Sequence, residues 1–75
     1  MNKARRSQIR LIINSLEIAK CSIEEVHDAE EEAFDNMPES LQESDRGDDM
    51  QDKIGQLEDA MDELDDVIDM LNDII

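Results

Sequence analysis

The sequence predicts an all-α protein, a single domain of 75 residues folded as an antiparallel hairpin of two long helices. Apolar residues recur three and four positions apart in both halves of the chain, the spacing of one helical face. The turn-forming residues gather in one central segment between these halves. We therefore place a first helix at about residues 4–34, a hinge at 35–47 and a second helix at about 48–75.

The first helix is indicated by an apolar stripe that steps by three and four residues. Its members are Ile9, Ile12, Leu16, Ala19, Ile23 and Val26. Glu30 then falls where an apolar residue is due, and Ala33 resumes the stripe. No proline or glycine interrupts the run from Lys3 to Phe34, so we expect one continuous helix with this stripe against its partner.

The hinge is indicated by Pro38, which cannot continue a helix and disfavours helical backbone at the residue before it. Ser44 or Asp45 can cap the helix that follows. We expect one short helical turn at residues 39–43, with Met37 and Leu41 folding back to close the end of the core.

The second helix has the more regular pattern. Its heptad seam is unbroken: Met50, Ile54, Leu57, Met61, Leu64, Ile68, Leu71 and Ile75. The seam consists of two columns, each a set of residues seven positions apart on one side of the helix. Ala60, Val67 and Ile74 add a third such column of apolar residues beside the seam. A stripe of three columns is typical of a helix buried in a bundle.

Stripes of this width exceed what one hairpin can bury. Leu11, Ile18 and Met70 lie outside the seams and gather at the end that holds both termini. We therefore expect a homodimer that forms a four-helix bundle, the alternative being that another protein covers this end. The expected oligomer interface consists of Ile9, Leu11, Ile12, Leu16, Ile18, Leu64, Val67, Ile68, Met70, Leu71 and Ile74.

The composition is strongly acidic, with 22 acidic and 7 basic residues and a net charge of −15. Direct binding of nucleic acid is disfavoured, because it relies on positive charge and stacking aromatic side chains, and Phe34 is the only aromatic residue. A single cysteine, Cys21, excludes a disulfide framework and suits a reducing compartment. The apolar stretch at 11–19 is too short and too polar for a signal peptide or a membrane span, so we expect a cytoplasmic protein without membrane contact.

The charge is distributed unevenly. Residues 1–23 carry five bases and one acid, residues 24–52 thirteen acids and one base, and residues 53–75 eight acids and one base. In the hairpin the basic start lies beside the acidic C-terminal segment, so we expect Arg5, Arg6 and Arg10 to form a clasp with its aspartates. The loop end retains a net charge of −12.

Aspartates form a regular row in the second helix. Asp52, Asp59, Asp66 and Asp73 recur every seventh residue, and acids at 59, 62, 66, 69 and 73 advance by roughly 5 Å each. That spacing is of the same order as that of backbone phosphates, so the row predicts a nucleic-acid mimic that binds a basic nucleic-acid-binding protein. The alternative is a surface that serves only solubility. The expected acidic face consists of Glu24, Glu25, Asp28, Glu31, Glu32, Asp45, Asp48, Asp49, Asp52, Asp59, Asp62 and Asp66.

Motifs for catalysis are weak. Glu24 and His27 have the Glu-x-x-His spacing of di-iron bundles, but we place both beside the seam, facing a helix whose core positions are apolar. Cys21 and His27 do not make a credible nucleophile and base, and no glycine-rich phosphate loop is present. We therefore expect no enzymatic activity, no metal and no cofactor, with His27 protonated beside the acids.

The hinge supplies a resemblance. The segment from Phe34 to Met50, followed by the Leu-Glu-Asp-Ala-Met-Asp-Glu-Leu heptad at 57–64, resembles small acidic proteins of unknown function from phages and mobile elements of Gram-positive bacteria. The resemblance covers about residues 23–75. It implies a phage protein in the host cytoplasm that inhibits a defence nuclease or CRISPR effector, as anti-restriction and anti-CRISPR proteins do. A structural or adaptor bundle acting through its apolar interface is the alternative.

Overall fold

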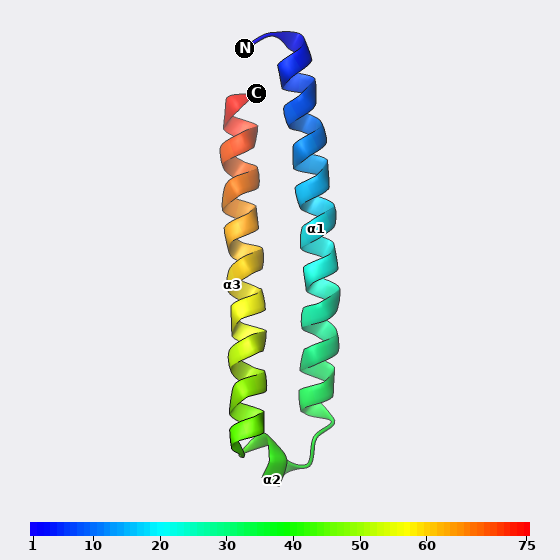
Figure 1. The fold of residues 1–75 in the computed structure, drawn as a ribbon, viewed down its shortest axis with the longest axis vertical. Helices are drawn as coiled ribbons and strands as arrows, with labels where there is room; N and C mark the ends of the chain where they lie inside the picture. Colours follow the sequence, from blue (N-terminus) through cyan, green and yellow to red (C-terminus); the bar gives the residue numbers. More distant parts are fainter.

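The computed structural model describes residues 1–75 and shows the predicted all-α antiparallel hairpin (Figure 1). Helix α1 spans Lys3–Asp35, the short helix α2 spans Glu39–Gln42, and α3 spans Asp45–Ile74. The long helices lie side by side, α2 closes one end, and both termini lie at the other end (Figure 1). The molecule measures 58 × 15 × 11 Å, so it is one helix thick and no further element covers either broad face.

Helix α1 has a defined cap at its start and a defined stop at its end. The Oδ1 atom of Asn2 accepts a hydrogen bond from the backbone N–H of Arg5 at 2.8 Å, as an N-cap does. The helix ends at Asp35, two residues before the Met37-Pro38 peptide that disfavours helical backbone. These bounds lie one residue beyond the predicted ones at each end.

Helix α2 is the short turn expected after Pro38. The carbonyl oxygen of Pro38 accepts hydrogen bonds from the backbone N–H groups of Leu41 and Gln42 at 2.9 and 3.1 Å. The side chain of Gln42 donates to the carbonyl oxygen of Phe34 at 2.9 Å, which ties the turn to the end of α1. Met37 is half-buried as expected, whereas Leu41 is exposed, so the prediction that Leu41 closes the core is wrong.

Helix α3 begins at Asp45, three residues earlier than predicted. Ser44 is its N-cap and accepts a hydrogen bond from the backbone N–H of Gly47 at 3.5 Å. Gly47 is buried against α2, where a Cβ atom would lie 2.0 Å from the carbonyl oxygen of Gln42. The absence of a side chain at Gly47 therefore allows α2 and α3 to pack this closely.

The predicted seam of α3 is confirmed. Ile54 and Ile68 are buried, and the other members are half-buried. These others are Met50, Leu57, Met61, Leu64, Leu71 and Ile75.

The predicted stripe of α1 is wrong at every second position. Ile12, Ala19 and Val26 are exposed, and residues one position further along the chain face α3 instead. The observed seam, of buried or half-buried residues, is Ile9, Ile13, Leu16, Lys20, Ile23, His27, Glu30 and Phe34. The sequence pattern did not reveal this seam because three of its members are polar. A search for apolar residues alone selects the neighbouring column of Ile12, Ala19 and Val26 instead.

Two of the three polar seam residues, Lys20 and His27, pair with acids on α3 and fix the register of the two helices. The Nζ atom of Lys20 lies 2.6 Å from Oδ1 of Asp65, and Nε2 of His27 lies 3.0 Å from Oε1 of Glu58. The step of seven from Lys20 to His27 is matched by a step of seven back along α3, so the register is constant. It places Arg10 level with the end of α3, and the first turn of α1 extends beyond that end (Figure 1).

Candidate functional site

The hairpin has two broad faces of opposite character, set by the columns that flank the seam on each side. The apolar face comprises Ile9, Ile12, Leu16, Ala19, Ile23, Val26, Leu57, Ala60, Leu64, Val67, Leu71 and Ile74. Its groove between the helices is lined by Ile23, Ala60, Glu63, Leu64 and Val67. The opposite, polar face has a groove lined by Glu17, Lys20, Cys21, Glu24, Asp65, Ile68, Asp69 and Asn72.

The apolar face is open to solvent. Ile12 and Ile74 are each 50% exposed and Val26 is 57% exposed, although all three belong to columns next to the seam. In the whole chain only three apolar side chains are buried, those of Ile13, Ile54 and Ile68. The hairpin alone therefore covers only the inner edge of its apolar residues.

The predicted oligomer interface falls into three parts. Ile68 is buried between the helices and is not available to a partner, so its assignment to an interface between copies is wrong. Leu11 and Ile18 are exposed, but helical periodicity places them on the outer side of α1, away from the apolar face. Met70 is also exposed and borders the apolar face, because it lies seven residues after Glu63, which lines the groove of that face. The remaining residues share the apolar face: Ile9, Ile12, Leu16, Leu64, Val67, Leu71 and Ile74.

The aspartate row lies on the outer side of α3, and its members Asp62 and Asp69 lie towards the polar face, where Asp69 lines the groove. We use this name for Asp52, Asp59, Asp62, Asp66, Asp69 and Asp73, all of which are exposed. None of them forms an ion pair, because every ion pair in the structure involves Lys20 or His27. The row is therefore a line of uncompensated carboxylates along one side of the molecule.

The other predicted acids are all exposed but do not converge on one patch. Glu24 and Glu31 border the polar face, whereas Glu25 and Glu32 lie on the outer side of α1. The remaining acids at the loop end, Asp45, Asp48 and Asp49, lie in the first turns of α3. The loop end is thus surrounded by negative charge, but only Asp28 and Glu31 meet around a common side chain.

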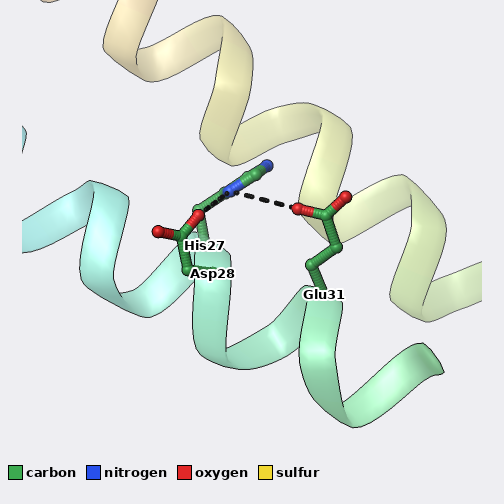
Figure 2. A group of neighbouring side chains, drawn as sticks. All are labelled: His27, Asp28 and Glu31. Carbon is green, nitrogen blue, oxygen red and sulfur yellow. Dashed lines mark hydrogen bonds and ion pairs between the residues drawn. The ribbon is translucent and has the colours of Figure 1, made fainter. Parts of the chain in front are cut away.

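That side chain is His27, which extends from α1 towards α3 (Figure 2). Its Nδ1 atom lies 3.0 Å from Oδ1 of Asp28 and 3.8 Å from Oε2 of Glu31. Its Nε2 atom lies 3.0 Å from Oε1 of Glu58. The imidazole is only 12% exposed, so the prediction that it lies beside the seam is wrong, and Glu58 was missed as its partner.

The carboxylates around His27 favour its protonated form. Hydrogen bonds to Asp28 and then to Glu58 raise the pKa of His27 above its ordinary value of 6.5. His27, Asp28 and Glu31 also form the one group that could hold a metal ion, with ligand atoms within 4.8 Å of one another; Glu24 is not part of it. A protonated imidazole donates at both nitrogens and has no lone pair for a metal, so the observed hydrogen bonds favour a proton over a metal here.

We expect this arrangement to make the stability of the hairpin depend on pH. Because the pKa of His27 is raised by folding, the stabilisation is fully present below pH 6.5 and is lost as the pH rises through the higher pKa of the folded state. The unfolding temperature, followed by circular dichroism, should therefore fall between pH 6 and pH 8, a range in which carboxylates do not titrate. In His27→Gln this fall should be absent; an equal fall in the variant would contradict the assignment.

Lys20 and Asp65 form the second polar contact between the helices, which the sequence pattern also missed. The hydrogen bond to Asp65 raises the pKa of Lys20, which is partly exposed. The sequence does contain a pattern that predicts these two contacts between the helices. Lys20 and His27 are seven apart in α1, and Glu58 and Asp65 are seven apart in the column that faces them.

The prediction that three arginines of α1 form a clasp with the aspartates of α3 is wrong, because the expected contacts are absent. Arg5, Arg6 and Arg10 form no ion pair with the aspartates of α3 or with any other acid. The register explains the absence for Arg5 and Arg6, because both lie beyond the level at which α3 ends. These positive charges are therefore free for a contact outside the hairpin.

The helices of the structure lack the combination of length and hydropathy that a membrane crossing requires. Comparison with protein-family models, curated proteins and solved structures gives no match. The resemblance to phage and mobile-element proteins therefore stays a prediction.

Proposed function

We propose that the chain is a non-enzymatic interaction protein that binds a basic, nucleic-acid-binding protein through the aspartate row. The observation that carries the proposal is the exposure of six aspartates along one side of α3, none of them in an ion pair. We also propose that the chain associates with itself through the apolar face.

Electrostatics explains why such a row suits a basic partner. Carboxylates that follow one another at roughly 5 Å repel one another, and α3 contains only two basic residues, Arg46 and Lys53, both before the row's densest part. A groove lined by lysine and arginine for phosphates would neutralise the row. Attraction between opposite charges would make association fast and strongly dependent on salt.

The class of partner follows from the same chemistry and from the resemblance. A line of short, evenly spaced anions imitates one strand of a nucleic acid, so a nuclease or another nucleic-acid-binding protein would accept it in place of its substrate. The resemblance to phage proteins adds the context of a bacterial defence nuclease or CRISPR effector in the host cytoplasm. In this role the chain would act as an inhibitor.

We expect the row, and not the net charge alone, to determine binding. The test compares the fourfold variant Asp59→Asn, Asp62→Asn, Asp66→Asn and Asp69→Asn with a control that removes four acids from α1. The control carries Glu17→Gln, Glu24→Gln, Glu25→Gln and Glu32→Gln. Both variants lose the same charge through isosteric changes.

The measurement is capture on the immobilised chain from a Gram-positive bacterial lysate, with retained proteins identified by mass spectrometry. We expect a nucleic-acid-binding protein that is released by salt and displaced by duplex DNA. Its retention should fall at least tenfold with the Asn variant and less than threefold with the Gln control. Equal loss in both variants, or retention that duplex DNA does not affect, would refute the proposal.

A second candidate function is favoured by the exposed apolar face. In an adaptor or structural protein, the partner would pack on side chains such as Ile12 and Ile74, each half exposed in the hairpin. The aspartates would then serve solubility alone. Under this alternative the Asn variant would retain its partners as well as the wild type does, and salt would not release them.

A further inference from the structure

The apolar face is large enough for a dimer interface. On α1 it runs from Ile9 to Val26, a length of about 26 Å, and it is two helices or about 20 Å wide. Its projected area is about 500 Å² per copy, and interdigitating side chains bury more than the projection. Two such faces together project about 1,000 Å², the level that a specific protein interface has to clear.

We propose that a second copy of the chain covers this face in an antiparallel arrangement, with α1 packed on the partner's α1 and α3 on the partner's α3. This inference rests on the self-association proposed above and adds its geometry. The face is self-complementary because its columns repeat every seven residues on both helices, so two copies can interdigitate as a four-helix bundle. A two-fold axis across the middle of the face gives both copies identical contacts.

Charge selects the antiparallel arrangement over the parallel one. By the register of the helices, the loop half of the hairpin is residues 24–61 and carries −13, whereas the half that holds the termini carries −2, because +4 from residues 1–23 lies beside −6 from residues 62–75. A parallel dimer would stack the two loop halves on each other. An antiparallel dimer places each loop half against the terminal half of the partner, where the arginines of α1 have no ion pair within their own chain.

One specific contact follows from the positions of Arg5 and Glu30. Arg5 shares a column with Ile12, four residues before the apolar face begins, and Glu30 shares a column with Ile23, four residues after the face ends at Val26. Antiparallel overlap of two faces therefore sets Arg5 of each copy level with Glu30 of the other. Within one chain the two residues are about 37 Å apart along α1 and cannot meet.

The arrangement also determines where the aspartate rows lie. With α3 packed on the partner's α3, both rows follow the same edge of the bundle in opposite directions, on helices whose axes lie about 10 Å apart. The two lines of anions then run antiparallel, as the two phosphate backbones of duplex DNA do. A parallel dimer would put the rows on opposite edges, so the antiparallel geometry joins the two parts of the proposed function.

The first test is a charge exchange measured by sedimentation equilibrium. Arg5→Glu alone and Glu30→Arg alone should each weaken the dimer about tenfold, because either change places like charges at two sites. The double variant should restore the dissociation constant to within about threefold of the wild type. Because the residues cannot meet within one chain, restoration reports a contact between copies, and additive losses would overturn the proposed contact.

The second test measures the direction of the copies with one spin label on each. In a Cys21→Ser background, a label at Ala33→Cys should give a distance near 45 Å between copies, since the two sites lie about 31 residues apart along the bundle. The parallel dimer predicts less than about 20 Å, which would overturn the arrangement but leave self-association intact. A monomer in both tests would overturn self-association as well, whereas binding through the aspartate row is decided separately by the Asn variant.

Discussion

Replacing Gly47 with alanine is expected to destabilise the hairpin by about 3 kcal/mol, near the upper end of the usual cost of overpacking. The added Cβ atom would lie 2.0 Å from the carbonyl oxygen of Gln42 and 2.7 Å from its Cα atom. These are backbone atoms and cannot rotate away, so α2 must separate from the start of α3. The hydrogen bond from Gln42 to the end of α1 would be strained by the same movement.

Gly55 provides the matched control, because it is the other glycine of α3 and a Cβ atom there meets nothing within 4 Å. Gly55→Ala should stabilise the chain by about 1 kcal/mol through its higher helix propensity alone. Urea unfolding followed by circular dichroism, at one protein concentration, measures both. The prediction fails if Gly47→Ala is as stable as the wild type or if both substitutions change stability in the same direction.

Placing a charge at Ile12 is expected to abolish self-association. Ile12 is half exposed on the apolar face, so in the proposed dimer Ile12→Asp buries two carboxylates without partners. Burial of an unpaired charge costs several kcal/mol, and we expect the dissociation constant to rise at least about 100-fold. The helix content should be unchanged at concentrations where the monomer is folded, because the side chain is exposed in the hairpin.

Leu11 is the neighbouring control, an aliphatic residue that is 67% exposed on the outer side of α1. Leu11→Asp should change the dissociation constant less than about threefold, because its side chain stays in solvent in the dimer. Sedimentation equilibrium of the two variants at equal concentration measures the difference. Equal weakening by both substitutions would place the contact surface elsewhere, for example on the outer apolar residues Leu11 and Ile18.

The helices were predictable because their signals are local. In α3 the seam consists entirely of apolar residues, so its three-and-four spacing could be read directly and Ile54 and Ile68 are buried as expected. In α1 the apolar residues occupy two adjacent columns, and the inner one is interrupted by Lys20 and His27. Only the acids on α3 show which column faces inward, and that information is distant in the sequence.

The sequence predicts which residues share one side of a helix, but not which way that side faces in the hairpin. The aspartate row could be recognised because its members lie on one helix, where spacing alone fixes a common side. The side on which Leu11, Ile18 and Met70 lie depends on how the two helices are rotated against each other. The absence of ion pairs at the arginines depends on the register, which is set by contacts such as that between His27 and Glu58.

The polar pairs of the seam also exclude misaligned hairpins. A heptad seam can slip by one repeat with little change in its apolar contacts, and only polar residues penalise such a slip. The column of α3 that faces Lys20 and His27 reads Gln51, Glu58, Asp65 and Asn72, with an amide at each end. Sliding by seven residues in either direction would replace one of the two carboxylates with an amide, so alignment is encoded along the length of the helices as well as in the turn.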